Sequence, residues 1–96
     1  MKGKTTPLLH DCPEDKSFRV ADGSVFRNYA QLLDGLKRME DEVFRSHVAE
    51  GRNDFKEWVL HVYSDDKLAR EMEEKPNRIP MAQSVARRLK ALALRH

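Results

Sequence analysis

The stretch that decides the fold reads Phe44-Arg-Ser-His-Val-Ala-Glu-Gly-Arg-Asn-Asp-Phe-Lys-Glu-Trp58. It combines the end of an amphipathic helix, a glycine turn and the capped start of a second helix. His47 follows Phe44 by three positions, which places both side chains on the apolar face of the first helix. We interpret the stretch as a structural corner made of six residues: Phe44, His47, Asn53, Asp54, Phe55 and Trp58.

The buried imidazole of this corner needs hydrogen-bond partners for both ring nitrogens. The nearest candidates are Asn53 and Asp54, just beyond Gly51. We therefore expect His47 to bond to the start of the next helix and to fix the angle between the two helices. The alternative is a catalytic pair of His47 and Asp54 with Cys12 as nucleophile, which requires the N-terminal segment to fold over the corner. We predict the structural role and no catalytic residue.

The segments before the corner are predicted to be a leader, a hairpin and helix. Residues 1 to 16 mix prolines and charges with few large apolar groups, so we expect a flexible leader that is either poorly ordered or loosely docked. Ser17 to Arg27 alternates like a β-hairpin, with Asp22-Gly23 as a two-residue type I′ turn. Asn28 is a suitable N-cap for the helical pattern that leads to His47. This pattern fits one long helix or two shorter helices with a bend near residues 39 to 41.

After the corner, the sequence predicts two further helices before the C-terminal segment. Asn53 or Asp54 caps the first, whose apolar positions follow helical spacing: Phe55, Trp58, Val59, Val62 and Tyr63. Ser64 or Asp65 then starts a short helix that ends near Met72. Aromatic residues at this spacing are typical of a core, so we expect them to be buried.

The C-terminal segment, residues 76 to 96, is predicted to be a linker followed by a basic amphipathic helix over Met81 to Arg95. Its apolar arc comprises Met81, Ala82, Val85, Ala86, Leu89, Leu92 and Ala93. Five cations are weak candidates for contact with a partner or an anion: Arg78, Arg87, Arg88, Lys90 and Arg95. Three interpretations stay open: packing on the chain's own domain, docking of a partner protein or a second copy, and contact with anionic nucleic acid or lipid.

Composition limits the class of protein. A chain of 96 residues with 40% hydrophobic and 35% charged residues fits one domain with a modest core. No apolar run is long enough for a membrane span, and the N-terminus lacks the apolar core of a secretory signal, so we expect a cytoplasmic location. The single cysteine allows no internal disulfide. His10 and Cys12 do not have the spacing of a four-ligand zinc site, and we predict neither a metal nor a cofactor.

The charge is unevenly distributed. The net charge is +2, but residues 28 to 75 carry eight basic and twelve acidic groups, whereas residues 76 to 96 carry five basic groups and no acidic group. An acidic body with a basic tail argues against a protein that wraps nucleic acid over its whole surface. It allows a local anionic contact at the C-terminus.

These elements predict a mostly α fold in which an N-terminal β-hairpin packs on a small bundle of four to five helices. The chain divides into residues 1–16 as leader, 17–75 as domain and 76–96 as linker and basic helix.

The residues that carry a resemblance are Phe18, Asp22-Gly23, Leu32, Leu36, Phe44, His47, Val48, Asn53-Asp54-Phe55, Trp58, Asp66, Leu68 and Ala69. They resemble a small, widespread prokaryotic domain family of unknown function.

That family has a Phe-x-x-x-Asp-Gly hairpin, a Phe-x-x-His corner and an Asn-Asp-Phe-x-x-Trp helix, and the resemblance covers about Phe18 to Met72. Ser46 departs from it, because an aromatic residue is expected there. The resemblance implies a portable module more than an enzyme and brings no catalytic residue. We therefore expect a non-enzymatic helical interaction or adaptor module whose C-terminal helix binds a larger protein partner or a second copy. The alternative is a ribonucleoprotein-associated or RNA-contacting accessory protein that uses the basic helix.

Overall fold

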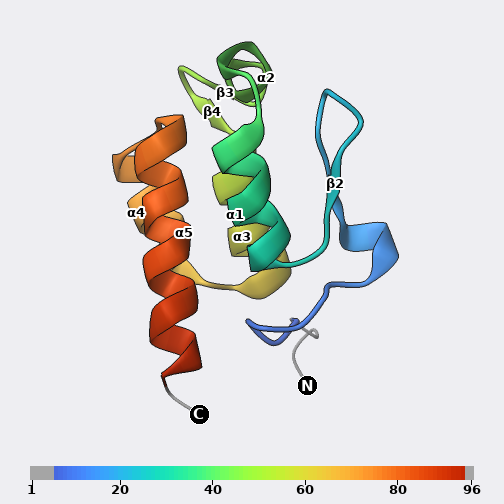
Figure 1. Cartoon of the computed structure of the whole chain (residues 1–96), viewed down its shortest axis with the longest axis vertical. Coiled ribbons are helices and arrows are strands. Elements are labelled where there is room, and N and C mark those ends of the chain that lie inside the picture. Colours follow the sequence, from blue (N-terminus) through green and yellow to red (C-terminus); the bar gives the residue numbers. More distant parts are fainter. Residues whose placement is uncertain (1–5, 95–96) are drawn as a thin grey trace.

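The computed structural model describes residues 6 to 94. In this part of the chain, the N-terminal hairpin and the helices pack on one another (Figure 1). The helices are α1 (Tyr29–Arg38), α2 (Asp41–Arg45), α3 (Asp54–Tyr63), α4 (Asp66–Glu74) and α5 (Arg78–Ala93). A 3-10 turn, Glu14–Lys16, precedes two antiparallel hairpins, β1 (Phe18–Arg19) with β2 (Val25–Phe26) and β3 (Val48–Ala49) with β4 (Arg52–Asn53). The prediction of a mostly α fold with an N-terminal hairpin on a helical bundle is confirmed.

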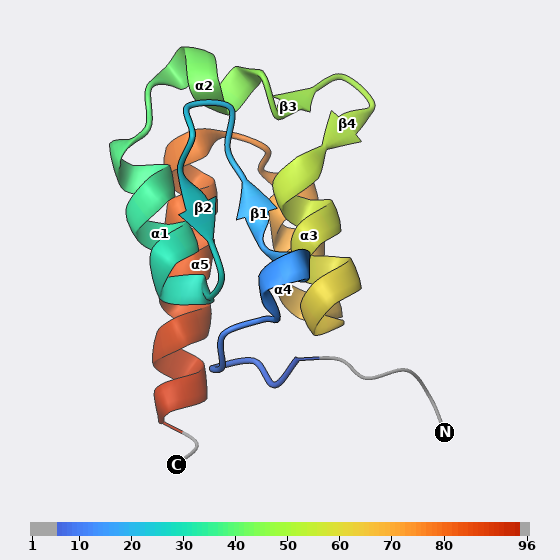
Figure 2. The same ribbon diagram turned by 90° about the vertical axis from the view of Figure 1, so that its right-hand side faces the viewer.

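The N-terminal hairpin lies across α1 and α3 (Figure 2). Phe18 of β1 stacks on Phe55 of α3 with ring centroids 4.8 Å apart. Phe26 of β2 lies against Gly35 of α1, where a Cβ atom would overlap the phenyl ring. Glycine is unfavourable in the interior of a helix. The close approach of Phe26 explains why a glycine nevertheless occurs in the middle of α1.

The loop of this hairpin differs from the prediction. The carbonyl of Val20 accepts a hydrogen bond from the amide of Gly23 (2.9 Å), and the amide of Val20 donates to the carbonyl of Ser24 (2.8 Å). The loop therefore has three residues, and only Gly23 has a positive φ, 98°. A type I′ turn needs a positive φ at both central residues, so that prediction was wrong. The glycine alone takes the left-handed geometry, and the Asp22 carboxylate accepts a hydrogen bond from the Ser24 amide (2.9 Å).

The helical pattern that leads to the corner is divided into two helices. Asn28 caps α1 as predicted, since its side chain accepts from the Gln31 amide. Met39 and Glu40 are both extended, with ψ of 154° and 149°, and they separate α1 from α2. The sequence left open one long helix or two shorter helices, and the structure has the two shorter helices.

Residues 6 to 16 contact the core at several points, whereas residues 1 to 5 lie outside the described part. Cys12 is fully buried, and its amide donates to the carbonyl of Arg27 (2.7 Å). The indole of Trp58 donates to the carbonyl of Lys16 (2.7 Å). The hydroxyl of Tyr63 lies 2.8 Å from the carbonyl oxygen of His10. The segment is held mainly through its backbone groups, which a count of apolar side chains cannot detect.

The C-terminal helix belongs to the same core as the other helices. It begins at Arg78, three residues before the predicted start, and it packs against α1 and α4 (Figure 1). Met81, Ala82, Val85 and Leu92 are buried, Leu89 is half-buried, and Ala86 and Ala93 are exposed. Residues 78 to 94 are therefore not a separate unit, and most of the predicted apolar arc is covered by the chain's own domain. None of the helices in residues 6 to 94 has the length and hydropathy needed to cross a membrane.

Candidate functional site

The corner around His47 differs in its backbone from the prediction. α2 ends at Arg45, so His47 lies in the connection between α2 and β3 and not on a helix. The two residues Glu50 and Gly51 then join β3 to β4, with Gly51 at a φ of 76°. The sequence predicted a turn at Gly51 but no strands around it. Two-residue strands are too short to show alternation, which explains why this second hairpin was missed.

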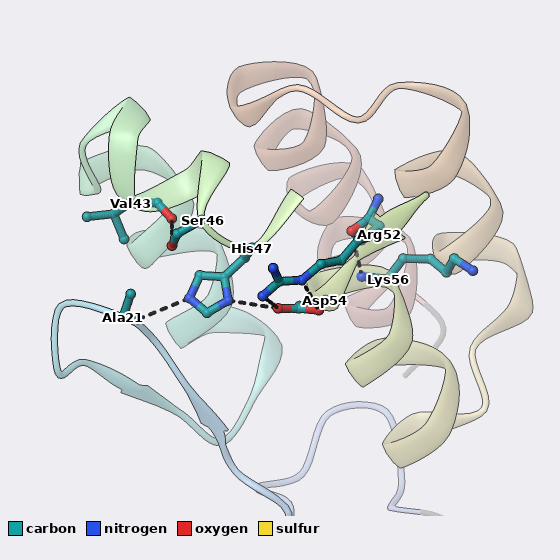
Figure 3. Close-up of polar contacts among 8 residues, drawn as sticks. Ala21, Val43, Ser46, His47, Arg52, Asp54 and Lys56 are labelled. Atoms are coloured by element: carbon teal, nitrogen blue, oxygen red, sulfur yellow. Dashed lines mark hydrogen bonds and ion pairs between the residues drawn. The ribbon is translucent and has the colours of Figure 1, made fainter. Parts of the chain in front are cut away.

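The His47 ring connects three parts of the fold (Figure 3). Its Nδ1 lies 3.0 Å from Oδ2 of Asp54, the first residue of α3, so the predicted hydrogen bond to the start of that helix is present. Its Nε2 accepts a hydrogen bond from the amide of Ala21 in the first hairpin loop (3.0 Å). Because Nε2 accepts, the proton of the neutral ring is on Nδ1, which donates to Asp54. The residue is 9% exposed, and its ring contacts the rings of Phe18 and Phe55.

Asp54 and Asn53 have different roles at the start of α3. A hydrogen bond from Arg52 (2.9 Å) is the main cause that lowers the pKa of the Asp54 carboxyl, and His47 adds to it against the opposing effect of burial. Asp54 is therefore ionised at neutral pH. The side chain of Asn53 accepts from the Lys56 amide (3.0 Å) and so is the N-cap. Phe44 and Trp58 are also buried, with Phe44 stacked on Phe55.

The contacts of His47 decide what this corner can do chemically. A general base needs a free ring nitrogen within reach of its substrate, and both nitrogens of His47 already have partners inside the protein. Cys12 has a separate environment: its carbonyl accepts two hydrogen bonds from Arg27, and burial raises the pKa of its thiol. A raised pKa opposes formation of the nucleophilic thiolate.

Two further histidines of the described residues, His10 and His61, lie on the surface. Nε2 of His61 lies 2.8 Å from Glu57. Within residues 6 to 94, potential metal ligands do not gather in groups of three or more. The histidines and the cysteine therefore form no common cluster in this part of the chain.

Arg88, predicted to face a partner, is instead part of an internal ion pair. Its guanidinium makes two hydrogen bonds to the carboxylate of Asp65, at 2.9 and 3.1 Å. The side chains of Arg88 and Asp65 are 14% and 1% exposed. The hydroxyl of Tyr29 donates to the same carboxylate (2.8 Å), and Asp65 also caps α4 through the Leu68 amide. This network joins α1, α4 and α5, so the charge of Arg88 is neutralised within the domain.

Arg78 also binds inside the domain. It pairs with Asp41 of α2 (2.8 Å) and donates to the carbonyls of Leu36 and Lys37 (2.8 and 3.2 Å). The last carbonyls of a helix have no partner within that helix, so Arg78 satisfies the end of α1 and ties it to α2. Its predicted contact with a partner or anion is therefore replaced by a structural role.

Two of the predicted cations remain exposed, Arg87 and Lys90, while Arg95 lies outside the described residues. They border a surface groove of about 410 Å³ between α4 and α5. Its lining includes Lys67, Glu71, Arg87, Lys90, Ala91 and Leu94. Leu94 is 77% exposed, the highest value among the exposed large hydrophobic residues of the described chain. Arg88 and Ser84 line it as well. This groove is the candidate functional site, and the sequence indicated it only through the cations of α5.

Comparisons of the chain with protein-family models, with curated proteins and with solved structures returned no match.

Proposed function

We propose that the protein is a non-enzymatic interaction module that binds a protein partner through the outward face of α5. One observation carries the proposal: Leu94, 77% exposed, lies beside Lys90 at a groove between two helices. A single exposed leucine is common on protein surfaces. A leucine at the border of a groove with cations around it is typical of a contact site, because it offers apolar area together with charges that orient a partner.

The proposed surface differs from the one expected from the sequence. The buried part of the apolar arc of α5 packs on α1 and α4, so it cannot dock a partner without unfolding the domain. The available face is the one that carries Arg87, Lys90 and Leu94. The resemblance to a portable prokaryotic domain agrees with an adaptor role and remains part of the proposal.

The contacts of the corner support a non-enzymatic role. His47 has both ring nitrogens engaged, and burial raises the pKa of the Cys12 thiol. The hydrogen-bonded His47 ring and the buried, protonated Cys12 side chain both contribute to the stability of the fold. The hydrogen bonds of His47 would have to break before its ring could act on a substrate.

The alternative of an RNA-contacting accessory protein has less support. Arg78 and Arg88 bind Asp41 and Asp65, so neither is available to neutralise a phosphate without breaking an internal contact. Titration of the purified protein with a single-stranded RNA oligonucleotide at several salt concentrations tests this alternative. Submicromolar binding that weakens steeply with salt would favour it over the protein-binding module.

A photo-crosslinking amino acid at position 94 tests the proposal, with the same amino acid at Val25 as the matched control. Both residues are large, apolar and exposed, but Val25 lies on the hairpin. We expect a protein to be crosslinked at position 94 and not at position 25. This protein should bind the purified full-length chain, and it should not bind the Lys90→Glu variant. Equal labelling at the two positions, or no crosslinked protein at all, would contradict the proposal.

A further inference from the structure

We propose that the groove between α4 and α5 binds an acidic amphipathic helix of the partner. This inference rests on the proposed function and specifies the chemistry of what the groove accepts. It follows from the shape of the groove, the charges along it and the backbone groups that border it.

The groove is formed by two helices that run in opposite directions, joined by residues 75 to 77 (Figure 1). Its two sides are one face of α4, with Lys67 and Glu71 four residues apart, and one face of α5, with Arg87, Ala91 and Leu94 at helical spacing. The lining runs from Lys67 to Glu71 on α4 and from Ser84 to Leu94 on α5, which correspond to about 6 Å and about 15 Å along the helix axes. A third helix fits such a groove along two to three of its turns, as in helix-in-groove recognition.

The backbone around the groove favours a helix over an extended segment. The amides and carbonyls of α4 and α5 bond within their own helices, so this surface offers no strand edge with which an extended peptide could pair. Recognition must therefore depend on side chains. An amphipathic helix presents a compact row of side chains to a groove with its own backbone already satisfied.

The charges specify an acidic occupant. Arg88 is bound to Asp65, but Lys67 on one side and Lys90 on the other are exposed. The only carboxylate in the described lining is that of Glu71, and its contact with Arg87 is long, 3.4 Å. Carboxylates on both flanks of a bound helix would meet these cations, and its apolar row would cover Ala91 and Leu94. A row of apolar residues at i, i+3, i+4 and i+7 with Glu on both flanks has this pattern.

Fluorescence anisotropy with labelled peptides tests the inference on the full-length protein. The probe is an 18-residue peptide with that apolar spacing and flanking Glu residues. Its controls are a peptide of the same composition in scrambled order and a peptide with Lys in place of Glu. We expect only the acidic amphipathic peptide to bind. Leu94→Asp and Lys90→Glu should each weaken this binding at least about tenfold, the loss typical of a central contact.

Ile79→Asp is the matched control variant, because Ile79 is 47% exposed on the same helix but does not line the groove. It should bind the probe like the wild type, and the fluorescence of Trp58 should confirm that every variant is folded. Equal binding of the scrambled peptide, or an equal effect of Ile79→Asp, would overturn the inference.

Two further outcomes separate the inference from the proposed function. If sedimentation shows a dimer that Leu94→Asp dissociates, the groove binds a second copy and the acidic-helix inference is wrong, while the interaction function stands. If the probe binds as expected but the crosslinker at position 94 captures no protein, the groove has the inferred chemistry and the proposed function is contradicted.

Discussion

The internal pair of Arg88 with Asp65 provides the sharpest test of how the helices are held together. In Arg88→Met, two charge-assisted hydrogen bonds are lost, and a carboxylate that is 1% exposed keeps only the Tyr29 hydroxyl and the Leu68 amide as donors. Removal of one partner from a buried ion pair costs about 3 to 5 kcal/mol, because the remaining charge is uncompensated. We expect a loss of this size in the free energy of unfolding. In a domain of this size, each kcal/mol lowers the Tm by roughly 4 to 8 °C.

Arg87→Met is the matched control for this experiment. Arg87 is the neighbouring residue and the substitution is the same, but its side chain is 63% exposed and its contact with Glu71 is long, 3.4 Å. Exposed ion pairs of this kind contribute about 0 to 1 kcal/mol. Urea titration followed by the fluorescence of Trp58, the one tryptophan of the chain, measures both variants. A comparable change in the two variants would refute the assignment of Arg88 to an internal role.

A double variant measures the pairing itself. In Asp65→Asn with Arg88→Met, neither buried charge remains, so the loss should be clearly smaller than the sum of the two single losses. The coupling between the two sites should reach at least about 1 kcal/mol, as expected for residues in one buried network. Additive losses would mean that the two side chains do not depend on each other.

Three further predictions concern the core. His47→Ala should lower the free energy of unfolding by about 2 to 4 kcal/mol, since it removes a buried ring and two hydrogen bonds. His61→Ala, on the surface, should change it by less than about 0.5 kcal/mol. Urea titration measures both variants. Gly35→Ala should lower the Tm despite alanine's higher helix propensity, because its methyl group would overlap the ring of Phe26. The double variant Gly35→Ala with Phe26→Leu should recover part of the lost Tm. Cys12 should react with a thiol reagent only after urea unfolds the protein, because it is fully buried; rapid labelling of the native protein would contradict the packing of residues 6 to 16.

The parts of the fold that were predictable are those recorded in local patterns. The cap at Asn28 and the aromatic spacing of α3 depend on residues within a few positions of each other, and both are present. The hydrogen bond between His47 and Asp54 spans seven residues and could also be inferred. Its second partner could not, because Ala21 contributes a backbone amide from 26 residues away, and every residue except proline has one.

The contacts of the N-terminal segment could not be specified from the sequence for a related reason. The segment has few large apolar side chains, but the carbonyls of His10 and Lys16 accept from the polar tips of Tyr63 and Trp58. Large aromatic side chains that are buried still need a partner for their O–H or N–H group. Two such aromatics on α3 were therefore a signal that hydrogen-bond acceptors lie close to this helix, although not which segment supplies them.

For the candidate site, the positions of the cations on α5 held more information than their number. The residues three and four positions away from Arg88 are Ser84, Val85, Ala91 and Leu92, and three of these four are buried. A cation in such surroundings lies at the edge of the packed face and needs an internal carboxylate.

The corresponding neighbours of Lys90 are Ala86, Arg87, Ala93 and Leu94, all exposed. Lys90 therefore points away from the packed face, and its charge is available to a partner without cost to the fold. Because neither Lys90 nor Leu94 is needed for packing, substitutions at these two positions should separate binding from stability. The same substitutions at Arg88 or Val85 cannot do so, because these side chains contribute to the core or to the network that holds it.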